Sequence, residues 1–473
     1  MVIQQVILQV PQKLDSYNAS GLRNLQRPTN PQNEAEHLCQ SKMSFNFLQR
    51  SVQAVVASSD KVQAQQLLET LHQQPLPEEY LPTNIRANPT QLSSFAISFD
   101  IDGVLLQGKH CLPNASESIT LLQRLSVPFI FLTNGGGMSE KAHTQRLANR
   151  LSVRLDARQF IQSHTPFLDL VPRFQEKNIL VLGGEQSNNI REVAEGYGFK
   201  NVITASDLAA ANPNIFPFSQ ISQEHHNKLA KSLPAGPLVI NAITVWSSPR
   251  DWGLDLQLCR DLLLSDGGLL GSTSRTAGDA TLPNHGFQSD TPELFFCNPD
   301  HLWPTDYKGA DGQLQLRFAQ GAFKAALEGI WSVETNGKAP LISRTVGKPE
   351  HETFAYANNK LQAYQKVLHG ASAPDIGSIW MFDDNPASGI LGANRYGRGW
   401  KSVLLETGVY VAGTVPSVRP TRFQRDVKTA MEYAFLQEGW SLPEEAWIWA
   451  TMLTQAIKKL QDVLNGPSNP QTL

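Results

Sequence analysis

The chain has 473 residues, of which 18% are charged and 41% hydrophobic, the composition of an ordinary globular protein. Its 40 basic and 43 acidic residues give a net charge of −3, so no bulk positive field is available to hold a nucleic-acid backbone. No apolar run reaches the roughly 18 residues that a membrane-spanning helix needs. The four cysteines form no C-x-x-C pair, which excludes a zinc ribbon and is typical of reduced thiols in an intracellular compartment.

Residues 1–93 are rich in Gln, Asn, Ser and Pro and show few sustained apolar periods. We expect this segment to be largely unstructured, apart from one helix within residues 45–72. The stretch that begins at Met43 carries Arg50 ahead of its first acidic residue, which is weakly similar to the composition of mitochondrial targeting segments. A plain glutamine-rich tail explains the same composition, so both interpretations stay open.

From residue 93 onward, apolar strands alternate with amphipathic helices, and this alternation predicts an α/β fold with a parallel sheet. The expected strands are 95–100, 127–134, 178–184, 201–205, 237–246, 341–348, 376–382 and 401–410. The expected helices are 114–125, 139–151, 188–197, 350–368 and 388–395, followed by two helical pieces within 421–464 that Pro443 divides. Two polar stretches are expected to be surface loops, namely 211–237 and 272–292.

The first expected strand ends in two acidic residues. Ligands of open parallel sheets lie beyond the carboxyl ends of the strands, so residues directly after each strand are candidate site residues. Asp100 and Asp102 are two residues apart and therefore share one side of an extended chain. One carboxylate there could act as a nucleophile and the other as a general acid or base. A surface turn that is acidic by chance is the alternative.

Three later strand ends carry polar residues of complementary chemistry. Thr133 and Asn134 precede three glycines, whose backbone can approach an anion closely. Lys348 would supply a positive point charge for a phosphate. Asp383 and Asp384 offer the hard oxygen ligands that suit Mg²⁺. Each also has a purely structural explanation: a glycine-rich turn, a solvated lysine, and an acidic turn that caps a helix.

The order of these signals is more specific than any one of them. The phrases F-D-I-D-G-V from Phe99, F-L-T-N-G-G-G from Phe131, G-K-P from Gly347 and D-N-P-A-S from Asp384 resemble the four motifs of the haloacid dehalogenase (HAD) superfamily of phosphotransfer hydrolases. This resemblance covers about residues 95–410. The long stretch between the Thr and Lys motifs is similar to the large α/β cap of the class IIA, NagD-like branch.

Three further phrases resemble the cat-eye-syndrome critical region protein five subfamily of that branch: P-R-D-W-G-L-D from Pro249, F-C-N-P-D from Phe296 and G-A-F from Gly321. The resemblance implies a Rossmann-like parallel-sheet HAD core with a large inserted α/β cap of the C2 type. The implied division of the chain is a low-complexity and candidate targeting segment (1–93), a split core (94–138 and 341–420), an inserted cap (139–340) and a C-terminal helical extension (421–473).

The resemblance also implies a role for each candidate residue. Asp100 would attack phosphorus and form an aspartyl-phosphate, while Asp102 would protonate the leaving group and then deprotonate the hydrolytic water. Thr133, Asn134 and Lys348 would bind the transferring phosphoryl group. The implied Mg²⁺ ligands are Asp100, Asp102 through its backbone carbonyl, and Asp384, with Asp383 as a further candidate.

One departure leaves two hypotheses open. Members of this type usually carry a second acid five residues after the metal-binding Asp, where this chain has Gly389, and the Gly that often precedes that Asp is here Asp383. The first hypothesis is a Mg²⁺-dependent phosphatase acting on a small phosphorylated metabolite, for which Gly389→Asp is expected to raise Mg²⁺ affinity. The second is a catalytically weak or inactive HAD-fold protein with a binding or scaffold role, in mitochondrial glycerophospholipid metabolism.

Three further expectations complete the sequence-based description. A dehalogenase is less favoured, because the metal-binding acids point to phosphorus chemistry whereas dehalogenation needs no Mg²⁺. The expected location is intracellular, with the mitochondrion favoured over the cytoplasm. No nucleic-acid partner and no membrane span are expected, and a homodimer through the cap stays open.

Overall fold

The computed structural model describes residues 49–87, 93–184, 189–303, 305, 307–313 and 315–466. The chain divides into two compact units, 1–54 and 55–473. Most of the expected low-complexity segment lies outside the described residues, including the stretch from Met43 to the first described residue. The described part is more helical than expected, because residues 49–58 are helical and α3 (Lys61–Gln73), η1 (Glu78–Tyr80) and α4 (Thr83–Ala87) follow.

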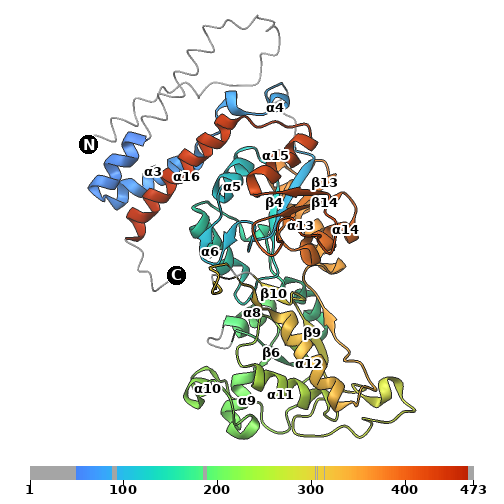
Figure 1. Ribbon diagram of the computed structural model, residues 1–473. Coiled ribbons are helices and arrows are strands. Elements are labelled where there is room, and N and C mark those ends of the chain that lie inside the picture. Colours follow the sequence, from blue (N-terminus) through green and yellow to red (C-terminus); the bar gives the residue numbers. More distant parts are fainter. Residues whose placement is uncertain are drawn as a thin grey trace, which may run out of the picture. The chain divides into compact units, whose positions relative to one another are not determined.

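Six parallel strands form the first sheet (Figure 1). In chain order they are β1 (Phe95–Phe99), β4 (Phe129–Leu132), β5 (Phe160–Ile161), β13 (Ser378–Asp383), β14 (Trp400–Leu405) and β15 (Arg422–Gln424). Their order across the sheet is β15-β14-β13-β1-β4-β5, so the chain first builds outward from β1 to β5 and later from β13 to β15 on the other side. The direction of winding reverses between β1 and β13, the place where open parallel sheets bind ligands.

Helices cover both faces of this sheet. Successive side chains of a strand point to opposite faces, so neighbouring residues of β1 contact different helices. All five residues of β1 are buried. Phe95 packs against Phe435 of α15 (Val427–Gln437) with ring centroids 5.3 Å apart, whereas Ala96 belongs to a cluster with Phe354. That residue lies on α13 (His351–His369), which packs on the same face as α14 (Leu391–Tyr396). The first sheet is therefore the middle of a three-layer α/β/α arrangement.

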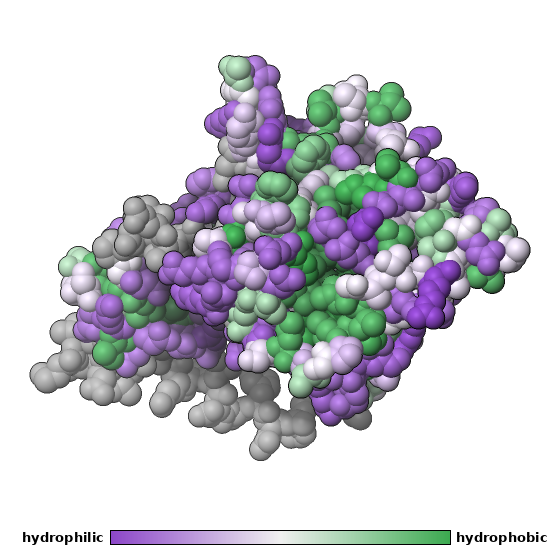
Figure 2. Space-filling model, turned by 90° about the horizontal axis from the view of Figure 1, so that it is seen from below, coloured by the Kyte–Doolittle hydropathy of each residue, from purple (hydrophilic) through white to green (hydrophobic). Residues whose placement is uncertain are grey.

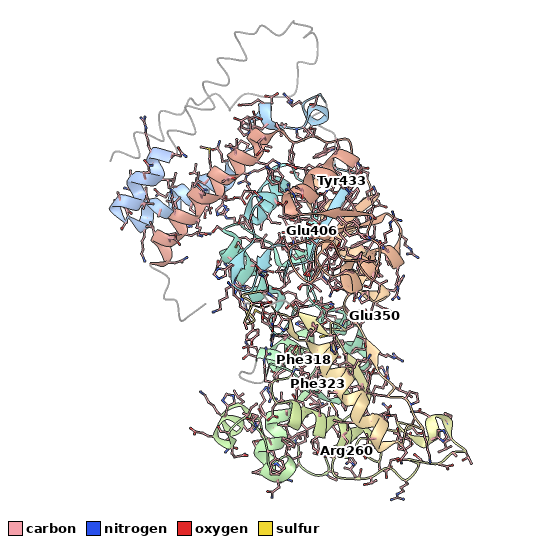
Figure 3. The ribbon with its side chains drawn as sticks, in the orientation of Figure 1. Arg260, Phe318, Phe323, Glu350, Glu406 and Tyr433 are labelled. Atoms are coloured by element: carbon pink, nitrogen blue, oxygen red, sulfur yellow. The ribbon has the colours of Figure 1, made fainter. Side chains whose placement is uncertain are left out.

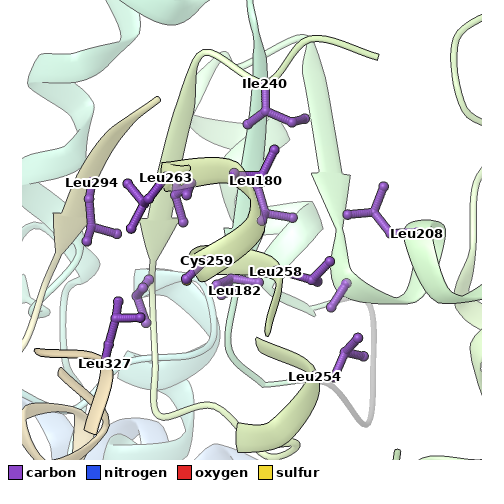
Figure 4. Packing of buried hydrophobic residues seen from close by; sticks show 14 of the residues in the cluster. Leu180, Leu182, Leu208, Ile240, Leu254, Leu258, Cys259, Leu263, Leu294 and Leu327 are labelled. Atoms are coloured by element: carbon purple, nitrogen blue, oxygen red, sulfur yellow. The ribbon is translucent and has the colours of Figure 1, made fainter. Parts of the chain in front are cut away.

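Five further strands form a second parallel sheet, in the order β12-β9-β8-β6-β7. They are β6 (Asn178–Leu182), β7 (Asn201–Thr204), β8 (Ala242–Val245), β9 (Glu293–Phe296) and β12 (Arg344–Thr345). Figure 4 shows Leu180 and Leu182 of β6 packed with Leu258 and Cys259 of α11 (Trp252–Leu263). The opposite face packs against α8 (Asn189–Tyr197) and two segments before it, η3 (Thr165–Leu170) and α7 (Val171–Phe174).

Aromatic contacts join the helices of the second sheet to its loops. The Trp252 ring lies 6.0 Å from that of Phe318 and 5.5 Å from that of Phe323, and the latter two are labelled in Figure 3. Phe323 lies on α12 (Gln320–Glu334), and Phe318 ends β11 (Arg317–Phe318).

The remaining helices and strands of the described residues are β2 (Leu106–Gln107), β3 (His110–Cys111), α5 (Ala115–Arg124), α6 (Glu140–Leu151), η2 (Ala157–Gln159), α9 (Ala205–Ala211), η4 (Pro213–Ile215), α10 (Gln223–Leu229), η5 (Pro283–Gly286), β10 (Leu302–Trp303), η6 (Pro386–Ile390) and α16 (Glu444–Asn465).

The expected α/β fold with parallel sheets is confirmed, but several elements differ from the expectation, and β9, α11 and α12 were not predicted. The strand predicted at 341–348 is reduced to β12, which pairs with β9 of the second sheet and not with the first sheet. Strands β5 and β15 were not predicted, and both belong to the first sheet. The expected loop at 211–237 contains α10. Segments of two or three residues carry too little periodicity to be recognised.

These strands bear on the proposed division into core and cap. Strand β5 lies in the segment assigned to the cap, and β15 lies in the C-terminal segment expected to be helical only. Sheet membership would extend the first core segment through Ile161 and the second through Gln424, and it would start the second after Thr345. The division itself stays a proposal, with boundaries moved in this way.

The two expected C-terminal helices are present as α15 and α16, separated at Pro443. α16 packs against α3, which precedes the first sheet in the chain, and against α5, which lies between β1 and β4. Among the residues that the structure describes, no helix combines the length and the apolar character needed to cross a membrane.

A buried ion pair gives a test of the second sheet. The guanidinium of Arg191 donates to Asp207 Oδ1 at 2.6 Å, and both side chains are almost completely buried. Arg191→Met is expected to lower the free energy of unfolding by about 3–5 kcal/mol, because it leaves a buried carboxylate without its cation. Chemical denaturation measures this change. Lys200→Met, at the exposed pair with Glu176, is the control and should have no resolvable effect; equal effects would contradict the prediction.

Candidate active site

A cavity of about 450 Å³ lies where the first sheet reverses its winding. Its volume is within the range of small-molecule sites. Asp100, Thr133 and Asp384 line it from the carboxyl ends of β1, β4 and β13. Ser247 and Asn298 line it from the carboxyl ends of β8 and β9, so both sheets direct their strand ends toward the same cavity.

Asp100 and Asp102 leave β1 in a fixed geometry. The Asp100 N–H donates to Phe382 O at 2.9 Å, which continues the β1–β13 ladder one residue beyond the strand. The chain then turns at Gly103, which has a φ of 85°. Burial, with the nearby Asp100 carboxylate, raises the pKa of Asp102 to about 7. Asp102 can therefore hold a proton near neutral pH, as a general acid must.

Lys348 lies in contact with two of the candidate acids. Its Nζ is 2.6 Å from Asp383 Oδ2 and 3.0 Å from Asp100 Oδ1, and its side chain is 1% exposed. Burial alone lowers the pKa of Lys348, but the carboxylates of Asp100 and Asp383 raise it above its ordinary value. The ammonium is therefore charged. It does not itself line the cavity but contacts Asp100, which does.

Asn134 fixes where Lys348 lies. Its Oδ1 accepts from the Lys348 N–H at 2.7 Å, and its Nδ2 donates to Lys348 O at 2.8 Å. The same Nδ2 lies 3.0 Å from Asp300 Oδ2 and 3.3 Å from Ser388 Oγ. The side-chain amide, which was expected to bind phosphate, is thus engaged within the protein. Lys348 follows an edge strand of the second sheet, so this amide joins the first sheet to the segment that leaves the second.

Thr133 lines the cavity with a hydroxyl that is anchored on one side. Its Oγ1 accepts from the Gly135 N–H at 3.0 Å, and its own N–H donates to Ile161 O at 3.1 Å. The side chain is 3% exposed. The hydroxyl proton is the group that could donate to an anion in the cavity.

Asp384 is held by tight backbone packing. Its Oδ2 accepts from the Val409 N–H at 2.6 Å. A Cβ on Gly103 would lie 2.3 Å from this oxygen, and a Cβ on Gly408 would lie 1.9 Å from it, so both positions require glycine. Burial, together with the Asp383 and Asp100 carboxylates, raises the pKa of Asp384 well above its ordinary value.

The three acids fit a divalent cation. One carboxylate oxygen from each of Asp100, Asp383 and Asp384 lies within 4.8 Å of the other two. Among these groups Lys348 supplies one positive charge against three acids. Burial, and after it the neighbouring carboxylates, raise the pKa values of Asp383 and Asp384. Oxygen ligands in a charged cluster of this kind suit Mg²⁺.

Gly389 and Asp383 compete for the same space. A Cβ on Gly389 would lie 2.2 Å from Asp383 Oδ2 and 2.7 Å from Met381 Cε. Asp383 is fully buried, and its Oδ1 accepts from the Asn385 N–H at 2.8 Å. The carboxylate of Asp383 therefore already fills the position that a side chain on residue 389 would occupy. The sequence suggests that Asp383 compensates for Gly389 through metal-bound water, but it does not reveal that the two positions share one space.

The segment after β9 supplies site residues that sequence reasoning missed. Asn298 Nδ2 donates to Asn134 O at 2.9 Å, and Asp300 accepts from the Asn134 amide. Burial raises the pKa of Asp300 to about 6. Both residues belong to the phrase that starts at Phe296, which was used only as a likeness. Recognition of β9 as a buried parallel strand would have marked them through the same carboxyl-end rule.

Comparison with known proteins gives two family matches and several relatives. Residues 97–200 match the family described as haloacid dehalogenase-like hydrolase, and residues 345–430 match the family described as HAD-hydrolase-like. The chain is 35% identical to a mitochondrial hydrolase of Saccharomyces cerevisiae, over 73% of this chain and 98% of that protein. It is 36% identical to a cardiolipin synthase (CMP-forming) / mitochondrial hydrolase fusion protein of Schizosaccharomyces pombe, over 74% of this chain and 55% of that protein.

Solved structures with a similar arrangement include a hypothetical protein of Pyrococcus horikoshii OT3, with 18% identity and a TM-score of 0.44 over 72% of this chain and 99% of that one. NagD from E. coli K-12 has 18% identity and a TM-score of 0.42, over 71% of this chain and 98% of that one. The Saccharomyces relative is matched along nearly its whole length. The chain belongs to the haloacid dehalogenase-like hydrolases.

Proposed function

We propose that this hydrolase is a Mg²⁺-dependent phosphatase of the class IIA, NagD-like branch, which hydrolyses a small phosphomonoester through an aspartyl-phosphate. One observation carries the proposal: the Asp100 carboxylate lines a ligand-sized cavity and lies 3.0 Å from the buried ammonium of Lys348. A carboxylate held beside a fixed cation and open to a cavity is an available nucleophile. The hydroxyl of Thr133 and the carboxyl of Asp102 face the same cavity.

In the first step an oxygen of Asp100 bonds to phosphorus, and the bond between phosphorus and the leaving oxygen breaks. Asp102 gives its proton to that oxygen, so the product leaves as an alcohol. In the second step Asp102 takes a proton from water, the water oxygen bonds to phosphorus, and the bond to Asp100 breaks to release inorganic phosphate. Thr133 and the glycine backbone after it would bind the phosphoryl oxygens, and Lys348 would offset the charge that Asp100 and phosphate share.

Mg²⁺ is the cofactor that the acid cluster fits. Asp100, Asp384 and the backbone carbonyl of Asp102 would hold it, with Asp383 as a further candidate. The bound ion would supply positive charge against the phosphate oxygens.

The competition between Asp383 and residue 389 supports an active enzyme over a non-catalytic scaffold. The acid that Gly389 lacks is matched by a carboxylate from Asp383 in the same space, and that carboxylate contacts Lys348. The expectation that Gly389→Asp raises Mg²⁺ affinity is therefore replaced, because the new side chain would meet Asp383. A weak or inactive HAD-fold protein with a binding role remains the second candidate.

The relatives support a setting for the reaction. The Saccharomyces relative is named a mitochondrial hydrolase, and the Schizosaccharomyces relative joins a hydrolase to a cardiolipin synthase in one chain. We therefore propose a mitochondrial location for this chain and a phosphorylated substrate from glycerophospholipid metabolism.

The second sheet and its helices are proposed to be the inserted cap, because their strand ends line the cavity opposite those of the first sheet. The face seen from below carries hydrophobic patches between hydrophilic ones (Figure 2). Exposed large hydrophobic residues between β7 and β12 are Phe218, Leu282, Trp303, Tyr307, Phe318, Val333 and Ile342. A homodimer through the cap remains a prediction.

The nucleophile is tested by Asp100→Asn. With Mg²⁺ and p-nitrophenyl phosphate, the wild type is expected to release nitrophenol and the variant to show no activity above background, because an amide cannot form the acyl-phosphate. Mass spectrometry of the acid-quenched wild type should locate a phosphoryl group on Asp100. Equal rates for the two proteins would contradict the assignment, and circular dichroism shows whether the variant is folded.

The metal site is tested by calorimetry with MgCl₂. Asp384→Asn is expected to weaken Mg²⁺ binding by at least about tenfold, because it removes an anionic oxygen from the cluster. Asp375→Asn, an equal change of charge at an exposed carboxylate outside the cavity, is the matched control. The same affinity in both variants would remove Asp384 from the site.

The shared space of Asp383 and residue 389 predicts a compensating pair. Asp383→Gly and Gly389→Asp are each expected to lower kcat/KM by about 10- to 100-fold, through loss of a Lys348 partner and through steric overlap respectively. The double variant should recover part of the loss, because a carboxylate on residue 389 then has room. Gly329→Asp, where nothing lies within 4 Å, is the control. Losses that simply multiply in the double variant would contradict the prediction.

A further inference from the structure

We propose that the cavity takes phosphomonoesters whose leaving group carries a second anionic group, such as a phosphate or a phosphodiester, and that a set of basic side chains at the cavity binds this group. The inference rests on the proposed function, since it names the substrate class of the same site. The set, called the basic rim below, comprises Lys109, Arg146, Arg150 and Arg250.

Two members of the basic rim share one face of α6. Arg146 and Arg150 are four residues apart, and His143, three residues before Arg146, also lines the cavity. Residues at this spacing lie on one side of a helix. Leu147 and Leu151 of the same helix are buried, so α6 packs with its apolar side and presents its basic side to the cavity.

The other two members approach from different segments. Lys109 lies in the turn between β2 and β3, and Arg150 Nη1 donates to the carbonyl of Gly108 at 3.3 Å, which ties this turn to α6. Arg250 follows β8 of the second sheet. The basic rim therefore combines segments that follow strands of the first sheet with one that follows a strand of the second.

The charges of the basic rim act on the side of the cavity where the leaving group lies. Asp102 is the residue proposed to protonate the leaving oxygen. A Cβ on Gly135 would lie 3.8 Å from Asp102 Oδ2 and 4.0 Å from His143 Cε1, which places Asp102 beside the basic face of α6. Asp102 also forms a β-bridge with Leu106, at the start of the turn that holds Lys109. Lys348 contacts Asp100 on the nucleophile side instead.

This division of charge argues for a second anion. The transferring phosphoryl group already has Lys348, the glycine backbone and the acid-bound cation as its partners in the proposed mechanism. The four cations of the basic rim, all at the lining of the cavity, exceed what a neutral leaving group requires. An anionic leaving group would receive charge-assisted hydrogen bonds from arginine, whose planar fork matches phosphate and phosphodiester oxygens.

The test compares matched substrates with Mg²⁺ present. The soluble pair is propane-1,3-diyl bisphosphate and 3-hydroxypropyl phosphate, which differ in the second phosphate. The micellar pair is phosphatidylglycerol phosphate and phosphatidic acid in detergent, which differ in the phosphodiester beside the reacting phosphate. The wild type is expected to show the higher kcat/KM for the first member of at least one pair, and the pair concerned tells a soluble source of the anion from a lipid source.

Arg146→Gln and Arg250→Gln are each expected to lower that preference about tenfold, a factor typical of one lost charge-assisted contact. Lys141→Gln on α6 and Arg275→Gln between β8 and β9 remove the same charge outside the cavity lining and should leave the preference unchanged. Equal losses on both members of a pair, or a wild type without preference, would overturn the basic rim and leave the phosphatase intact. Lack of hydrolysis of every probe would overturn the proposed function and this inference with it.

Discussion

The candidate site depends on the two ion pairs that the buried ammonium of Lys348 forms with Asp100 and Asp383. Removing one partner from a buried ion pair costs several kcal/mol, because the remaining charge keeps its desolvation cost without compensation. The lysine therefore needs its two carboxylates, and each carboxylate needs the lysine. Asp384 adds a further acid that forms no ion pair with a lysine or arginine of the described residues, and the proposed Mg²⁺ would balance its charge.

The same lysine makes the site depend on both sheets. Lys348 follows β12, an edge strand of the second sheet, yet it contacts Asp100 of β1 and Asp383 of β13. The side-chain amide of Asn134 fixes the lysine through both backbone groups of that residue, and Asn298 from the end of β9 holds the Asn134 carbonyl. Neither sheet alone assembles the nucleophile with its cation. An insertion that folds as a sheet of its own thus contributes to the geometry of the site as well as covering it.

The parts of the fold and site that were predictable from the sequence are those that belong to long, buried strands or directly follow them. Asp100, Asp102 and Asp384 were found because β1 and β13 are apolar runs of five and six residues that end in acids. Lys348 was found as well, although its strand belongs to the other sheet. Strands β5 and β15 were missed, since two or three residues show no period. Compensation of Gly389 by Asp383 was considered from the sequence, but their steric overlap was not predicted, because only the turn of η6 brings the two positions together.

The balance of charge explains why a near-neutral protein can bind a phosphate ester here. Asp100, Asp102, Asp300 and Asp384 line the cavity, and those that are ionised would repel an anionic substrate in the absence of nearby cations. Lys348 offsets part of this charge beside the nucleophile, and the basic rim offsets part of it beside Asp102. Positive charge lies at both ends of the cavity in this proposal. A substrate with one anionic group at each end is therefore favoured over a substrate that carries both anionic groups at one end. The proposed selectivity of the cavity therefore rests on the distribution of the charges, which composition does not reveal.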